Sequence, residues 1–108
     1  MNTATNPQIP VIRTERLGLA LSAPVRLAIL GALSDGQPRM VNELARMVGQ
    51  KPGLVSKHLW VLRWAGMVEM NRRLHQVPAA YIASVEKRHL DFGNCLLRLP
   101  DEKGMPTL

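Results

Sequence analysis

Residues 41–68 read VNELARMVGQKPGLVSKHLWVLRWAGMV, and this stretch decides the fold. Apolar side chains recur in it at helical spacing in two runs, which predicts helices over residues 41–48 and 51–65. Gly49 tolerates the positive φ that commonly follows the last turn of a helix, and Gly66 does the same for the second run. A short helix, a tight turn and a longer helix are typical of a helix-turn-helix, whose second helix can enter a DNA groove.

The second helix of this motif is expected to bury one face. Val55, Leu59 and Leu62 lie at the spacing of an inward face, with Trp60 as a further candidate. Leu54 serves either core packing or contact with a thymine methyl group, and the sequence leaves both interpretations open.

Two further helices are expected before the motif. The first covers about residues 11–21, where Gly18 weakens the pattern. The second begins at Ser22, which is expected to act as the N-cap, with Pro24 in the first turn, and it continues to about Leu33.

After the motif, two strands are expected over residues 67–72 and 77–83, joined by a loop at 73–76. A last helix is expected to open at Ser84 and to run to about residue 99. The predicted order is α-α-α-α-β-β-α. This order is that of a winged helix-turn-helix, a mostly α fold with a small β-hairpin.

The length of 108 residues indicates one domain, which we place at residues 11–99. A flexible N-terminal arm (1–10) and a disordered tail (100–108) are expected on either side. The sequence shows neither a secretory signal nor an apolar run that could span a membrane, and its single cysteine, Cys95, fits a reducing compartment. These features together favour a cytoplasmic protein.

The positive charge is concentrated around the motif. The chain carries a net charge of +6, and residues 39–73 account for +5 of it, with seven basic residues against two acidic ones. The basic residues are Arg39, Arg46, Lys51, Lys57, Arg63, Arg72 and Arg73, and the acidic ones are Glu43 and Glu69. A polyanion partner such as nucleic acid explains this concentration, and the alternative is a solvated face that keeps a small protein soluble.

Several segments occur in an order and spacing that resembles the ArsR/SmtB-type winged-helix repressors. They are ALSAPVRLAIL (20–30), NELA (42–45), VSKHL (55–59), VLR (61–63), AGMV (65–68) and Tyr81. The resemblance covers about residues 15–85. It implies a homodimer formed by the first and last helices, which binds a partly palindromic operator in double-stranded DNA and represses transcription. It also implies release of DNA when an inducer binds, and the sequence does not indicate which small molecule that is. No cofactor is expected.

The resemblance also indicates which side chains reach DNA. On the second helix of the motif they are Lys51, Gly53, Leu54, Ser56 and Lys57, and on the hairpin they are Arg72, Arg73, His75 and Gln76. The run Lys51-Pro52-Gly53-Leu54 stands where the family usually has Ser, Gln, Ser and Thr. This departure removes most groups that read base edges by hydrogen bonds, so the preference for sequence is expected to be modest or to depend on DNA shape. His58 is expected to support the helix instead.

The known sensor sites of the family are not reproduced. Met40-Val41-Asn42 stands where one metal site has Cys-x-Cys, and the expected last helix carries only Glu86, His89, Asp91 and Cys95 at spacings that do not match another. No metal site is therefore expected. Cys95 is either a redox-active thiol that bridges two subunits or a small buried apolar residue.

Two other classes of function compete with DNA binding. An enzyme has little support, because the sequence contains no Gly-rich phosphate loop, no nucleophile motif and no paired acidic residues. The stronger competitor is a winged-helix protein-interaction module with only non-specific DNA binding. The Pro52-Gly53-Leu54 run favours that alternative, and the +5 segment opposes it.

Overall fold

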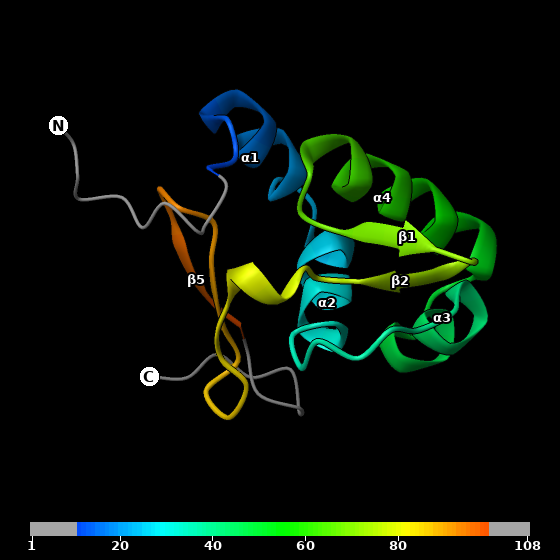
Figure 1. Ribbon diagram of the computed structural model, residues 1–108. Coiled ribbons are helices and arrows are strands. Elements are labelled where there is room, and N and C mark those ends of the chain that lie inside the picture. The colour runs from blue at the N-terminus through cyan, green and yellow to red at the C-terminus, as the bar shows by residue number, and fades with distance from the viewer. Residues whose placement is uncertain (1–10, 100–108) are drawn as a thin grey trace, which may run out of the picture.

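The computed structural model describes residues 11–99, and within this range the chain forms four helices followed by two small antiparallel sheets. The expected arm (1–10) and tail (100–108) lie outside the described residues. Figure 1 shows α1 and the C-terminal sheet at the left, with α3 and the tip of the first hairpin at the right.

The four helices confirm the predicted order. They are α1 (Thr14–Ala20), α2 (Pro24–Ala32), α3 (Val41–Val48) and α4 (Pro52–Ala65). Proline opens both α2 and α4, at a position where its missing N–H leaves no hydrogen bond unmade. Gly49 and Gly66 follow α3 and α4 in the left-handed conformation, with φ of 70° and 85°.

The prediction for Ser22 is wrong in detail. Ala23 occupies the N-cap position of α2, and no side chain caps that helix. The Ser22 hydroxyl instead donates to the backbone carbonyl of Leu19 at 2.7 Å, so it serves the end of α1. A serine between two helices can satisfy either one, and spacing alone does not decide between them.

The core is formed where α2, α3 and α4 pack together. Its fully buried members include Ile29, Leu30, Leu33, Leu44, Val55, Leu59 and Leu62. Trp60 does not face this core, because its side chain is 59% exposed. The inward face of α4 therefore consists of Val55, Leu59 and Leu62, as expected, and does not include Trp60.

The first hairpin is shorter than expected. Strand β1 (Glu69–Asn71) pairs with β2 (Leu74–Gln76), and Arg72 and Arg73 form the turn with φ of 53° and 68°. The second strand therefore occupies the segment expected to be a loop. Two-residue turns of this kind favour Asn-Gly or Gly, and an Arg-Arg pair gives no such signal in the sequence. Arg39 extends this sheet through two backbone hydrogen bonds with His75, of 2.8 and 2.7 Å.

The predicted last helix is wrong. A 3₁₀ turn, η1 (Ala79–Tyr81), leads into three antiparallel strands, β3 (Ile82–Ser84), β4 (His89–Asp91) and β5 (Leu96–Arg98).

Local turn chemistry explains the difference. Ser84, expected as a helix cap, accepts a hydrogen bond from the Lys87 N–H and closes the β3–β4 turn instead. The Asp91 carboxylate accepts from the Gly93 N–H, and Gly93 takes a φ of 93°. Phe92, next to this turn, is fully buried and lies 5.1 Å from the ring of Tyr81.

The C-terminal sheet also holds the start of the described chain. The Ile12 N–H donates to the carbonyl of Phe92 at 3.3 Å, and the Asn94 side chain donates to the carbonyl of Ile12 at 3.1 Å. Because no last helix exists in residues 11–99, a dimer formed by the first and last helices lacks one of its two expected surfaces.

Candidate nucleic-acid interface

The turn between α3 and α4 presents the start of α4 to solvent. The Gln50 N–H closes the end of α3 by donating to the carbonyl of Ala45 at 3.0 Å, and Lys51 then occupies the N-cap position of α4. Residues 51–54 are all exposed. The first turn of α4 is thus accessible to a partner, as expected for the N-terminal residues of the second helix of this motif.

The expected contact residues of α4 lie on this exposed surface. Lys51, Gly53, Ser56 and Lys57 are exposed, and Leu54 is 39% exposed. The exposure of Leu54 favours the interpretation as a surface residue over that of a core residue. The chain thus presents two cations and one apolar group there, together with a glycine that allows close backbone approach.

A surface hollow at the helix-turn-helix turn brings a third basic residue of this region, Arg46, close to Lys51. The hollow is an open depression of about 590 Å³ lined by Asn42, Ala45, Arg46, Gly49, Gln50, Lys51 and Pro52. Arg46 is exposed on α3 and lines the same hollow as Lys51. Its basic side chain near the turn, within the +5 segment, was the signal in the sequence that marks it.

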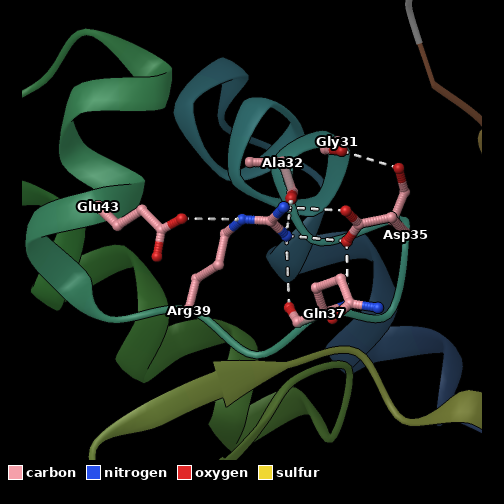
Figure 2. Close-up of polar contacts among 7 residues, drawn as sticks. Gly31, Ala32, Asp35, Gln37, Arg39 and Glu43 are labelled. Atoms are coloured by element: carbon pink, nitrogen blue, oxygen red, sulfur yellow. Dashed lines mark hydrogen bonds and ion pairs between the residues drawn. The ribbon is translucent and has the colours of Figure 1, made fainter.

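Two arginines of the basic segment are engaged within the protein. Arg39 donates to both carboxylate oxygens of Asp35, at 2.8 and 2.9 Å, and lies 3.4 Å from the carboxylate of Glu43 (Figure 2). Its guanidinium also donates to the carbonyl of Ala32 at 3.0 Å, at the end of α2. Arg63 donates to the ring of His75. The cations of the segment that remain exposed are therefore Arg46, Lys51, Lys57, Arg72 and Arg73.

The hairpin keeps two of its four expected contact residues in the open. Arg72 and Arg73 are exposed at its tip. Gln76 is half-buried and donates to the carboxylate of Glu69 at 2.7 Å, across the β1–β2 pair. Its amide is thus engaged in holding the hairpin together.

His75 is not available as a DNA contact, which corrects that expectation. Its side chain is only 2% exposed, because β2 lies between β1 and Arg39. Nε2 accepts a hydrogen bond from Arg63 at 2.8 Å, and Nδ1 has no partner in the described part of the chain. Burial, and then the charge of Arg63, lower the pKa of His75 below its ordinary value.

His58, a residue of α4, connects this helix to α2. Its Nδ1 lies 2.9 Å from Nη1 of Arg26, whose guanidinium also donates to the carbonyls of Ala20 and Leu19. Burial, and then the charge of Arg26, lower the pKa of His58. Arg26 therefore joins the end of α1 to α2 and α4, in agreement with a structural role for His58.

The residues compared with a family sensor site lie on β4 and in the loops of the C-terminal sheet. His89 and Asp91 lie on β4, Glu86 lies in the preceding turn, and Cys95 is half-buried in the loop before β5. Within residues 11–99, no three His, Cys, Asp or Glu side chains gather closely enough to hold a metal ion. In the same range, no helix is long and apolar enough to cross a membrane.

The four-helix arrangement, the exposed start of α4 and the β1–β2 hairpin are those of a winged helix-turn-helix protein. Residues 23–70 match the family model described as "Bacterial regulatory protein, arsR family", so this part of the chain is similar to the helix-turn-helix domain of that family, and the match supports a DNA-binding transcription regulator. The match begins at the start of α2 and ends within β1, so it contains the whole helix-turn-helix. No curated protein and no solved structure matches the chain.

Proposed function

We propose that this protein is a transcriptional repressor that binds a palindromic operator as a homodimer. In this proposal α4 enters the major groove, with Lys51 and Lys57 on phosphates or guanine, and the hairpin tip places Arg72 and Arg73 on the neighbouring phosphates. The observation that carries the proposal is the exposed first turns of α4, with free cations, within an ArsR-family domain. The proposed place of action is the cytoplasm, where such a regulator meets its DNA.

The chemistry of this face supports a particular kind of DNA reading. Pro52 and Gly53 offer no side-chain hydrogen bonds to base edges, and Ser56 is a short donor one turn further on. Leu54 is positioned to contact a thymine methyl group, the apolar mark of the major groove. We therefore propose that phosphate contacts and DNA shape supply most of the affinity, with Leu54 adding a preference for thymine.

An apolar surface supports the proposed homodimer. Leu19 of α1 is 53% exposed, and Trp60 and Trp64 of α4 are 59% and 40% exposed. Arg16 stacks 5.0 Å from the ring of Trp64, so α1 and α4 form this surface together. We propose that α1 meets its copy here, because a palindromic site requires two recognition helices related by a two-fold axis. Leu19→Glu is then expected to yield monomers in light scattering and to weaken operator binding.

The same exposed tryptophans favour a second candidate function. Tryptophan is enriched at the centres of protein interfaces, so this surface would also suit a protein-interaction module that binds DNA without specificity. The two functions differ in what they predict for DNA, which makes them separable in one experiment.

The experiment is a titration of the full chain against a duplex from its own promoter region and against a random duplex, at several salt concentrations. The proposed function predicts that the promoter duplex binds clearly more tightly than random DNA at physiological salt. Equal and steeply salt-dependent binding to both duplexes would identify the interaction module. Absence of binding to either duplex at low salt would overturn DNA binding altogether.

A further inference from the structure

Helix α4 is held on two flanks by contacts between an arginine and a histidine. On one flank, Arg26 of α2 donates to Nδ1 of His58 at 2.9 Å. On the other flank, Arg63 of α4 donates to Nε2 of His75 in β2 at 2.8 Å. A guanidinium has only donors, so each contact requires an unprotonated ring nitrogen as acceptor. Both contacts therefore exist only while the imidazole is neutral.

Among residues 11–99, the His75 ring has Arg63 as its hydrogen-bond partner and no acceptor that would stabilise a positive charge. The side chain is 2% exposed, and its Nδ1, which carries the proton in this tautomer, has no partner. The charged group that faces it from α4 is Arg63. Arg39 lies on the neighbouring strand with its guanidinium on Asp35, and Glu69 of β1 is bonded to Gln76. An added proton would place two cations within 3 Å of each other in a buried site.

His58 repeats this arrangement with less burial. The charged group that faces it is Arg26 of α2, which is itself turned toward the carbonyls of Leu19 and Ala20 at the end of α1. The preceding residue on α4 is the exposed Lys57, a second cation. Neither imidazole has a carboxylate among its partners in the described part of the chain.

We propose that the Arg26–His58 and Arg63–His75 contacts make the DNA-binding surface acid-sensitive, so that protonation of the two histidines releases α4 and the hairpin from their supports and the protein leaves its DNA. This inference rests on the proposed function, since it concerns regulation of the same surface. Its direction is opposite to the general expectation, because added positive charge ordinarily strengthens binding to DNA.

The pH range follows from the direction of the two shifts. Each pKa is lowered in the folded protein from the ordinary histidine value of about 6.5. The stabilising contribution of each contact is therefore fully present above about pH 6.5 and is lost as the pH falls below that value toward the lowered pKa. The response thus begins below about pH 6.5.

Two substitutions test the proposal at the level of single atoms. His75→Gln places an amide oxygen near the position of Nε2, and His58→Asn places one near the position of Nδ1. Both amides accept a hydrogen bond from arginine and neither titrates. The matched control is His89→Gln on β4, which removes a histidine that takes part in neither contact.

Binding of the promoter duplex is measured for the full chain between about pH 7.5 and pH 5.5, together with the urea midpoint at each pH. Between the higher and the lower pH, the wild type and the His89→Gln variant are expected to lose about tenfold or more in DNA affinity and to show a lower urea midpoint. In the His58→Asn, His75→Gln double variant, the affinity and the urea midpoint are expected to stay unchanged over the same pH range. The same pH profile in the wild type and the double variant would overturn the inference. If no variant binds DNA at neutral pH, the proposed function fails, and the urea midpoints still decide the acid response.

Should the double variant fail to fold, an NMR titration of the wild type replaces it. The ring protons of His75 are expected to titrate below the ordinary value, and hydrogen exchange of the β1–β2 amides is expected to accelerate over the same pH range. Titration of His75 at about pH 6.5 with unchanged exchange would contradict the proposal.

Discussion

Arg39 donates to both oxygens of Asp35 with its side chain and pairs with His75 through its backbone. One residue therefore connects the turn after α2, the start of α3 and the hairpin. The hydrogen bonds from Arg39 hold the pKa of Asp35 below its ordinary value. A basic residue counted toward a polyanion surface thus serves the fold instead.

Replacing Asp35 with asparagine is expected to lower the free energy of unfolding by about 1 kcal/mol near pH 7, because the replacement removes one acceptor and the charge attraction. The Asp35 side chain is 38% exposed, so solvent screening keeps the loss small. Its pKa is lowered on folding, so the contribution is present above its ordinary pKa of about 3.8 and disappears as the pH falls below it.

Urea unfolding of the wild type and Asp35→Asn at about pH 7 and pH 3 measures this effect. The difference between the two proteins should shrink at the lower pH. Glu15→Gln is the matched control, because the Arg13–Glu15 pair is about two-thirds exposed and should contribute little. An equal loss in the control would mean that general charge, and not the Arg39 contact, is responsible.

Lys57→Ala is expected to weaken promoter binding without changing the urea midpoint, because the side chain is exposed opposite the buried face of α4. If Lys57 neutralises a phosphate, the slope of log K against log salt becomes shallower by about 1 in the variant. Lys87→Ala, in the β3–β4 turn, removes the same charge far along the chain from α4. Equal weakening by both substitutions would indicate that only net charge matters.

Replacing Arg72-Arg73 with Asn-Gly is expected to have opposite effects on folding and on binding. Both arginines have positive φ, a conformation that Asn and Gly adopt at lower cost. The free energy of unfolding of the double variant should therefore be about 1 kcal/mol higher than that of the wild type. Its DNA affinity should fall, because the hairpin tip no longer carries two exposed cations. Paired urea and DNA titrations measure both, and a stability gain with unchanged affinity would exclude the hairpin tip from the interface.

Gly93→Ala distinguishes the C-terminal sheet from the helix that the sequence indicated. In a helix the substitution would stabilise by about 0.5–1 kcal/mol. In the observed turn Gly93 has a φ of 93°, and an added Cβ would lie 2.9 Å from the Val11 side chain, so the free energy of unfolding should fall by more than about 1 kcal/mol. Gly18→Ala is the control, since that position in α1 is helical with open space around it, and it should stabilise. A decrease in the free energy of unfolding for Gly93→Ala would support the turn, and an increase would support a helix at this position.

The sequence was most informative where the structure depends on local chemistry. Helix α3, the left-handed Gly49 and the prolines that open α2 and α4 were all predictable, because capping and helical periodicity act within a few residues. The exposure of the first turns of α4 was expected from the family resemblance, while periodicity left the position of Leu54 open. Most of the segments that resemble the ArsR family lie in these helices, and the family match over residues 23–70 confirms the resemblance.

The remaining features depend on contacts between residues far apart in the sequence. Nothing local distinguishes His75 as a buried acceptor from His75 as a surface cation, because Arg63 and Arg39 reach it only in the folded chain. The C-terminal strands were mistaken for a helix because Ser84 is an equally good helix cap and turn residue. The burial of Phe92 in the core also depends on long-range packing, which the spacing of apolar residues does not predict.

The hydrogen bonds between Ile12 and the Phe92–Asn94 turn have a consequence for synthesis. The segment that leads into α1 is the first described part of the chain to leave the ribosome, and its partners are among the last. Residues 23–70 can form their local helices early, but the entry to α1 stays without these partners until the β4–β5 loop has emerged. The domain can therefore complete its fold only after the C-terminal sheet has been synthesised. A chain that stops before this sheet would carry α4 without the hydrogen bonds that hold the entry to α1.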